Sequence, residues 1–279
     1  MALYRGYGAL HGATNMTAVC PDAFLGLACD LAATAGEIVR GYFRTSVAID
    51  QKTDLTPVTI ADREAEAAMR RLIQETFPDH GIIGEEAGAE REDASFVWVL
   101  DPVDGTKRFI TGNPLFGTLI ALLREGEPIL GVIDMPILGE RWIGASGHPT
   151  LFEGAGKRQE ARVRPCAGLA EASLYATSPQ MFMGRDLDAF ERVRQAVKTP
   201  LYGGDCYSYG LLTSGHNDLV IEADMAPYDY LAQVPVVTGA GGFMTDWQGE
   251  ALRLGSGHRV LAAGDARCHG AAIRLLQAD

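Results

Sequence analysis

The chain has 279 residues, of which 47% are hydrophobic and 22% charged, so it has enough apolar material for a large core and is not expected to be disordered. Its 24 Lys and Arg against 36 Asp and Glu give a formal net charge of −12, which argues against nucleic acid as a partner because phosphate backbones need a basic surface. The excess of carboxylates is compatible with binding cations.

The cysteines are odd in number and contain no C-x-x-C pair, and they lie at Cys20, Cys29, Cys166, Cys206 and Cys268. This usage predicts reduced thiols in a cytoplasmic protein. No apolar run reaches the roughly 18 residues of a membrane-spanning helix, so no membrane partner is expected. Residues 1–21 contain no apolar core of a signal peptide and are expected to form an N-terminal tail.

Two helices are predicted near the start of the chain. Apolar residues recur at helical spacing from Asp22 to Phe43, and Asp22 is the expected cap. A second amphipathic pattern begins near Asp62 and ends before Pro78. The segment between these helices, 47–62, predicts short strands joined by a turn.

Strand patterns dominate the next part of the chain, at 81–86, 95–101, 116–136 and 139–146. The letters REGEP inside the third segment predict a hairpin. Residues 22–155 are therefore expected to form an α+β subdomain, with two helices on a largely antiparallel sheet.

Residues 156–279 alternate between strands and helices. Strands are predicted at 172–177, 201–203, 219–222 and 260–263, and helices at 187–197, 207–214, 230–238 and 266–276. This βα alternation predicts an α/β subdomain that completes the active site.

The segment VWVLDPVDGTKRFITGNP places Asp101 and Asp104 directly after an apolar strand. Pro102 is expected to end that strand at Asp101, and the turn brings both carboxylates to one point. Oxygen ligands of this kind suit Mg²⁺. Gly105 lets the backbone approach a ligand closely, and the amides of Gly105 and Thr106 face an anion if a helix starts there. The sequence therefore predicts a metal-held phosphate.

Simpler interpretations of these residues remain open. A D-P-x-D-G segment is also a common turn at the exit of a strand. Glu86 is expected to be a solvated neighbour of Glu85, and Asp62 is expected to be a helix cap. The separate strand ending in Glu85 and the Thr after D-P-x-D-G favour the functional interpretation.

The segments GEE, WVLDPVDGTKRFITG and APYDYLAQVPVVTGAGG together resemble the inositol monophosphatase family of Mg²⁺-dependent phosphatases, from about Phe24 to the C-terminus. The resemblance implies an α-β-α-β-α layered sandwich that combines α+β and α/β parts. It also implies two or three Mg²⁺ ions, with Mn²⁺ as an alternative, a homodimer and a small phosphorylated substrate.

The resemblance also implies roles for individual residues. Glu85, Asp101 and the carbonyl of Val103 are expected to hold the first metal, and Asp101, Asp104 and Asp229 the second. Thr106, supported by Asp54, is expected to orient a metal-activated water for attack on the phosphorus, with Glu85 nearby. Gly105, Thr106 and Asp229 are also expected to contact the substrate. Tyr228 stands where the family has Trp.

Within that family, the chain most resembles the histidinol-phosphate phosphatase branch, through segments such as YGGDCYSYGLL and DLVIEADMAPYDYLA. The resemblance implies that Asp205 and Glu222 lie beside the organic part of the substrate. Anionic partners suit an amine and an imidazole, which a polyol does not require. Asp205 is equally compatible with capping the helix that follows it.

Three other functions are kept as alternatives. The first is a phosphatase of the same family that acts on inositol phosphate, a sugar phosphate or a 3′-phosphonucleotide. The second is a haloacid-dehalogenase-type phosphatase, although the spacing here is Asp-x-x-Asp and not Asp-x-Asp. The third is a catalytically silent regulator that binds metal or phosphate.

Overall fold

The computed structural model describes residues 19–46, 49–51 and 57–278. The longer helices are α1 (Asp22–Tyr42), α2 (Ile60–Thr76), α4 (Arg185–Ala196) and α8 (Ala266–Leu276). The shorter ones are α3 (Thr106–Ile110), α5 (Tyr207–Thr213), α6 (Pro227–Tyr230) and α7 (Gln233–Gly239). No described helix has the length and apolar character needed to cross a bilayer.

The first sheet has eight strands in the order β10-β9-β8-β7-β6-β5-β3-β4. Their bounds are β3 (Gly81–Gly84), β4 (Gly88–Glu90), β5 (Phe96–Asp104), β6 (Gly117–Arg124), β7 (Glu127–Met135), β8 (Glu140–Ala145), β9 (Leu151–Gly154) and β10 (Lys157–Glu160). All neighbours pair antiparallel except β3 and β5. The prediction of a largely antiparallel sheet is confirmed, and the sheet includes β10, which follows residue 155.

Both faces of this sheet are buried, as the alternation along β5 shows. Trp98 and Leu100 pack in a cluster with α1 and α2, whereas Val97 and Val99 pack in a second cluster with α5, α6 and α7. A strand with helices on both faces needs apolar residues at every position. This requirement explains the continuous apolar run before Asp101.

The helices on the second face lie directly on the strands. A Cβ atom added to Gly131 of β7 would lie 1.8 Å from the carbonyl oxygen of Ala232, and one on Gly144 of β8 would lie 2.3 Å from that of Pro235. Larger residues at these two positions would force the backbone of α7 away from the sheet. The glycines therefore set how closely the middle layer of helices approaches the first sheet.

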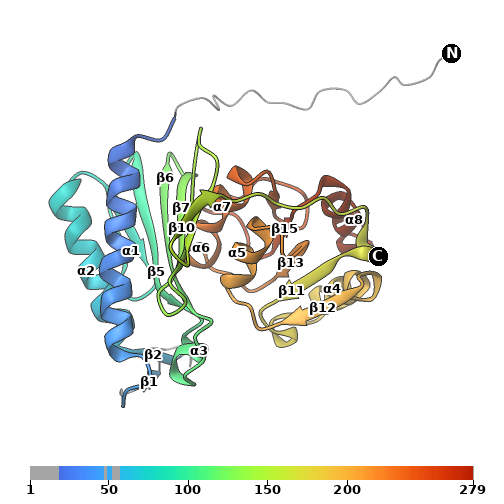
Figure 1. Ribbon diagram of the computed structural model, residues 1–279, viewed down its shortest axis with the longest axis horizontal. Helices are drawn as coiled ribbons and strands as arrows, with labels where there is room; N and C mark the ends of the chain where they lie inside the picture. The colour runs from blue at the N-terminus through green and yellow to red at the C-terminus, as the bar shows by residue number, and fades with distance from the viewer. Residues whose placement is uncertain (1–18, 47–48, 52–56, 279) are drawn as a thin grey trace.

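The second sheet has five strands in the order β12-β11-β13-β15-β14. Their bounds are β11 (Ser173–Ala176), β12 (Thr199–Tyr202), β13 (Leu219–Glu222), β14 (Phe243–Thr245) and β15 (Val260–Ala263). Helices α4 and α8 pack on its outer face. Figure 1 shows the resulting order of layers, α1 and α2, sheet, α5 to α7, sheet, α4 and α8. The predicted α-β-α-β-α sandwich is confirmed.

Most predicted elements are present, with local corrections. The hairpin turn at Glu125 and Gly126 is confirmed, because both residues have positive φ (50° and 80°), as a two-residue hairpin of type I′ requires. The helix predicted over 230–238 is instead two helices, α6 and α7. The strands β4, β9, β10 and β14 were not predicted, and each is only three or four residues long.

The cap predicted for α1 is wrong. Pro21 occupies the N-cap position and Asp22 lies inside the first turn, without a side-chain cap hydrogen bond. Its charge is still favourable there because the helix dipole is positive at that end. Just before α1, Cys20 is buried and its amide donates to the carbonyl of Ser146.

Candidate functional site

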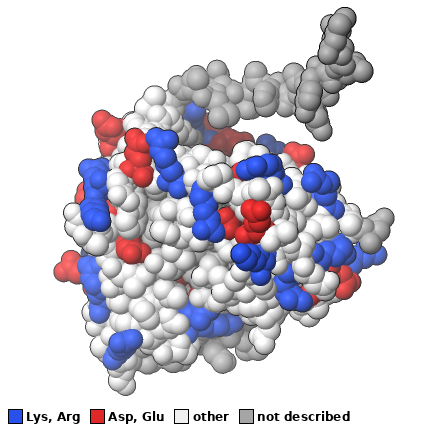
Figure 2. Space-filling model, turned by 45° about the vertical axis from the view of Figure 1, so that its right-hand side comes forward, with Lys and Arg blue, Asp and Glu red and all other residues white. Residues whose placement is uncertain are grey.

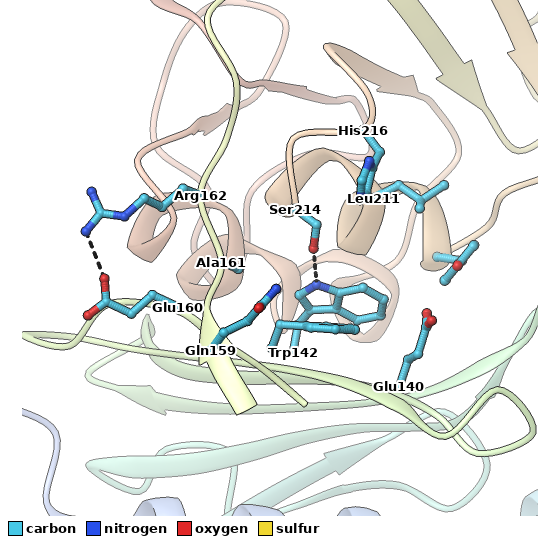
Figure 3. Close-up of a pocket in the computed structure, with 11 residues that line it drawn as sticks. Glu140, Trp142, Gln159, Glu160, Ala161, Arg162, Leu211, Ser214 and His216 are labelled. Atoms are coloured by element: carbon cyan, nitrogen blue, oxygen red, sulfur yellow. Dashed lines mark hydrogen bonds and ion pairs between the residues drawn. The ribbon is translucent and has the colours of Figure 1, made fainter. Parts of the chain in front are cut away.

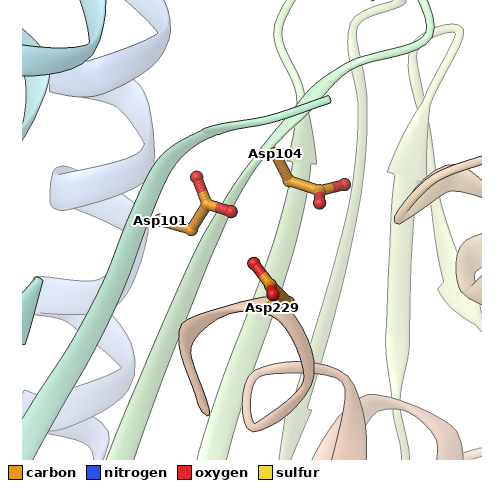
Figure 4. A group of neighbouring side chains, drawn as sticks. All are labelled: Asp101, Asp104 and Asp229. Carbon is orange, nitrogen blue, oxygen red and sulfur yellow. The ribbon is translucent and has the colours of Figure 1, made fainter. Parts of the chain in front are cut away.

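Three aspartates converge at the boundary between the first sheet and the middle helices. Asp101 and Asp104 come from β5 and Asp229 from α6, and one carboxylate oxygen of each lies within 4.8 Å of the others. Figure 4 shows the three side chains close together, with Asp229 facing the strand that carries Asp101 and Asp104. Residues more than 120 positions apart in sequence are thus brought into one cluster.

An irregularity in β5 explains how two residues of one strand join the cluster. The prediction that Pro102 ends the strand is wrong, because β5 continues to Asp104, which pairs with Gly117 after a register shift. On a regular strand, residues three apart face opposite sides, and a bulge re-aims one of them. The amide of Val103 donates to Asp101 Oδ1 at 2.9 Å and fixes the turn.

Backbone amides hold the other two carboxylates. Asp104 Oδ2 accepts from the amide of Cys206 at 2.8 Å, and Asp229 Oδ2 accepts from the amide of Ala226 at 2.7 Å. Both of these hydrogen bonds engage the Oδ2 atom of the carboxylate. The side chains are oriented before any cation arrives.

The cluster is electrostatically unfavourable without a cation. Burial, followed by the charge of Glu85, raises the pKa of Asp101 well above its usual value. Burial and then the charge of Asp205 raise the pKa of Asp104 to about 7, and burial and then the charge of Asp104 raise that of Asp229. A divalent cation would offset this repulsion, and an all-oxygen site fits a hard ion. The donor set therefore fits the metal that the sequence predicts.

Glu85 lies beside this cluster on the turn that follows β3. A hydrogen bond with Glu85 adds to the rise in the pKa of Asp101, so the two side chains lie within hydrogen-bonding distance of each other. Its amide donates to the carbonyl of Leu100 at 3.1 Å, so β5 anchors the turn. Glu86 is half-buried and is therefore not the solvated neighbour that we expected.

The segment after Asp104 forms the short helix α3. Gly105 occupies its N-cap position with φ 87°, a left-handed conformation that favours glycine. The hydroxyl of Thr106 donates to the carbonyl of Val103 at 3.2 Å. Thr106 and the Val103 carbonyl are therefore neighbours. Asp54, the residue expected to support Thr106, lies outside the described residues.

Asp62 is a buried acid that caps α2, and its burial was not expected from the sequence. The predicted capping role is confirmed, because its Oδ2 accepts from the amide of Thr59 at 2.9 Å in a capping box. Its Oδ1 is also buried but has no hydrogen-bond partner among the described residues. Burial raises the pKa of Asp62, and the nearby charge of Glu85 adds to the rise. A buried oxygen of this kind is available to a ligand or water.

Asp205 does not cap α5 with its side chain. Cys206 is the N-cap residue, and the Asp205 carboxylate instead forms an ion pair with Arg108, with 2.6 Å between Nε and Oδ2. The backbone of Asp205 has φ 45°. Arg108 was not singled out in the sequence, because two residues this distant show no local signal of their contact.

Glu222 is 1% exposed and lies at the end of β13. Its carboxylate accepts from the amide of Thr177 at 3.0 Å and from the hydroxyl of Tyr209 at 2.8 Å. Burial raises the pKa of Glu222 to about 7, and the charges of Asp104 and Asp205 contribute to the rise. Glu222 therefore lies within electrostatic reach of the aspartate cluster.

A separate pocket of about 230 Å³ lies between β8, β9 and α5 (Figure 3). Trp142 is one of the residues that line it, with the indole nitrogen donating to the Ser214 hydroxyl at 2.8 Å. None of the clustered aspartates lines it.

The face drawn in Figure 2 shows Lys and Arg side chains interspersed with Asp and Glu.

The profile of the Inositol monophosphatase family matches residues 21–278. The chain therefore belongs to this family of phosphatases, whose members are typically metal-dependent and act on small phosphorylated substrates. Among curated proteins, it is 49% identical to "Bifunctional phosphatase IMPL2, chloroplastic" of Arabidopsis thaliana, over 92% of this chain and 75% of the relative.

Two further relatives bear on the substrate. The chain is 36% identical to a "Histidinol-phosphatase" of Chlorobaculum parvum, over 82% of this chain and 87% of the relative. Among solved structures, an inositol monophosphatase from Zymomonas mobilis superimposes with a TM-score of 0.84 at 44% identity, covering 92% of this chain and 98% of the other.

Proposed function

We propose that this protein is a Mg²⁺-dependent phosphomonoesterase that hydrolyses histidinol phosphate to histidinol, a step of histidine biosynthesis. The observation that carries the proposal is the convergence of Asp101, Asp104 and Asp229, with Glu85 beside them and two further buried acids, Asp205 and Glu222, within electrostatic reach. The relative from Chlorobaculum parvum supports the substrate.

The metal ligands in this proposal are Glu85, Asp101, the Val103 carbonyl, Asp104 and Asp229. When bound, divalent cations supply positive charge for the phosphoryl oxygens and make water more acidic. The protein contributes fixed positions, because amides hold Asp104 and Asp229 before binding. The all-oxygen donor set suits hard cations, of which Mg²⁺ is the one proposed here. Mn²⁺ prefers the same kind of ligands and is the alternative.

Thr106 is proposed to orient the attacking water. Its hydroxyl donates to the carbonyl of Val103, and its two lone pairs remain available to accept. Asp54 was expected to support it, and Asp62 is a second candidate because its buried Oδ1 has no partner among the described residues. A carboxylate near the water would orient it and accept its proton.

The phosphate group of the substrate and the organic part of the substrate are proposed to bind on opposite sides of the aspartate cluster. The amides of Gly105 and Thr106 face the phosphate, whose negative charge suits the start of a helix. Asp205 and Glu222 face the cationic part. Because Arg108 pairs with Asp205, Glu222 carries the larger share of the selectivity for cationic substrates.

A second candidate substrate is inositol phosphate. The solved relative from Zymomonas mobilis, 44% identical over nearly its whole length, is titled an inositol monophosphatase.

A homodimer and a cytoplasmic location also belong to the proposal. The homodimer rests on the family resemblance and the cytoplasmic location on the cysteine usage, although the Arabidopsis thaliana relative is named chloroplastic.

The decisive experiment measures phosphate release from histidinol phosphate and inositol 1-phosphate by the purified full chain, with Mg²⁺ and with chelator. We expect turnover only with Mg²⁺, and a higher kcat/KM on histidinol phosphate. Preference for inositol phosphate would reverse the order of the two candidates. No turnover on either substrate at saturating Mg²⁺ would favour a silent regulator.

A further inference from the structure

A buried carboxylate on α2, outside the aspartate cluster, holds the turn that carries Glu85. Glu66 is 1% exposed, and its two oxygens accept from the amides of Glu86 at 2.7 Å and Ala87 at 3.0 Å. Arg70, one turn further along α2, donates to the same carboxylate at 2.7 Å. A charge this deeply buried is tolerated only when it is fully paired, so these bonds fix its position.

The turn itself is fixed on two sides. It connects β3 to β4, with Gly84 paired opposite Gly88. On one side the Glu85 amide donates to the Leu100 carbonyl of β5 at 3.1 Å. On the other side the Glu66 carboxylate holds the next two amides, and Arg70 also donates to the Gly88 carbonyl. The Glu85 side chain therefore starts from a backbone that is held by both β5 and α2.

Gly84 makes room for this arrangement. A Cβ atom added there would lie 2.1 Å from Glu66 Oε1, and its three nearest neighbours would all be atoms of the Glu66 carboxylate. Gly84 is not among the glycines with positive φ, so backbone conformation does not require glycine. The close approach of the carboxylate is the reason that glycine is needed here.

We propose that Glu66 is a positioning residue that presents Glu85 to the divalent cation of the site. This inference rests on the proposed metal site and adds a residue from a different element. Groups that orient metal ligands typically change affinity 10–100-fold when they are altered. Glu66→Gln keeps the volume of the side chain but removes its charge and one acceptor oxygen. The side chain at position 66 can then no longer accept from both amides of the turn, so the turn is held less firmly.

The test is calorimetric titration of the purified, chelator-treated full chain with MgCl₂. We expect Glu66→Gln to bind Mg²⁺ about tenfold more weakly than wild type. Gly84→Ala should also weaken binding, because the new methyl group displaces the same carboxylate. The double variant should lose less than the sum of the two effects. Glu75→Gln, an exposed acid on the same helix, is the matched control and should bind as wild type does.

A second measurement follows the turn directly. Amide hydrogen exchange at Glu86 and Ala87 should be faster in Glu66→Gln than in wild type, because one oxygen no longer accepts. Unchanged Mg²⁺ affinity in a folded Glu66→Gln variant would overturn the inference, even with a lowered melting temperature. If that variant does not fold, Gly84→Ala decides by the same criterion.

The two proposals fail in different ways. A wild-type protein that binds no Mg²⁺ and hydrolyses no phosphomonoester would refute the proposed function. A wild-type protein that does both, with Glu66→Gln and Gly84→Ala binding Mg²⁺ as tightly, would refute only the positioning role.

Discussion

The Arg108 guanidinium lies 2.6 Å from the Asp205 carboxylate, although the two residues are 97 positions apart. Arg108 is on α3, which begins two residues after Asp104, and Asp205 precedes Cys206, whose amide donates to Asp104. The ion pair therefore ties together the two segments that orient Asp104. It also neutralises one of the acids that we expected to face the substrate.

Replacing Arg108 with Met should destabilise the protein by about 1–3 kcal/mol, because it leaves a buried carboxylate without its charged partner. Urea denaturation followed by circular dichroism measures this change. Arg158→Met, which removes an exposed pair with Glu153, is the control and should stay within about 0.5 kcal/mol of wild type. Equal effects for the two variants would show that the Arg108 pair contributes no more than an exposed one.

Asp104→Asn should abolish binding of the second proposed metal, which Asp101, Asp104 and Asp229 hold, while preserving the fold. The substitution removes a charge from the cluster but hardly changes volume, so the metal-free variant should melt at a higher temperature than metal-free wild type. Mg²⁺ should raise its melting temperature less than it raises that of wild type, because only the first proposed metal can still bind, and turnover should fall by more than about 100-fold. Differential scanning fluorimetry with and without MgCl₂ tests this. A metal-free variant that melts below wild type would contradict the role of repulsion.

Stability without metal should fall as pH rises. The folded-state pKa of Asp104 is raised to about 7, above the ordinary value of an aspartate. The folded state therefore binds more protons than the unfolded state, and stability is lost between about pH 4 and pH 7. Mg²⁺ should reverse this loss above pH 7 and have little effect at pH 5, because its binding displaces the protons. Melting curves across this range, with and without Mg²⁺, measure both effects, and a flat metal-free profile would oppose the expectation.

Asp62→Asn should separate the capping role of this residue from a catalytic one. The remaining carbonyl oxygen can still accept from Thr59, so we expect a folded protein with an unchanged Mg²⁺ affinity. If Oδ1 orients or deprotonates the water, kcat should fall by about 100-fold or more. Steady-state kinetics on Asp62→Asn and Asp54→Asn side by side would show which acid supports Thr106. An unchanged kcat in Asp62→Asn would leave that residue with the cap alone.

Glu222→Gln should reduce selectivity more than it slows the chemistry. We expect the ratio of kcat/KM on histidinol phosphate to that on inositol phosphate to fall by about tenfold, equivalent to about 1.4 kcal/mol of lost preference. Glu171→Gln, at an exposed position, is the control. An equal loss on both substrates would indicate that Glu222 acts through the metal site and not on the cationic group.

Local patterns in the sequence were sufficient for most of the fold. The bounds of β13, β15 and α8 match the predicted ones, because apolar periodicity is read within a few neighbouring residues. The sequence also indicated that the carboxylates of Asp101 and Asp104 lie close together, since both residues are in one short segment. The end of their strand was not indicated, because a bulge depends on the partner strand as well as on Pro102.

The sequence determined most helices and strands and the acidic segment of β5, and its resemblance to a known family implied the layered α-β-α-β-α order and the phosphatase function. Only the tertiary structure decided that Asp205 pairs with Arg108, that Asp62 retains a buried oxygen without a partner among the described residues, and that Glu66 holds the turn of Glu85. The physical reason is the sequence distance over which each kind of interaction acts. Propensity, caps and alternation act between near neighbours, whereas the state of a buried charge depends on groups that only the folded chain brings within hydrogen-bonding distance.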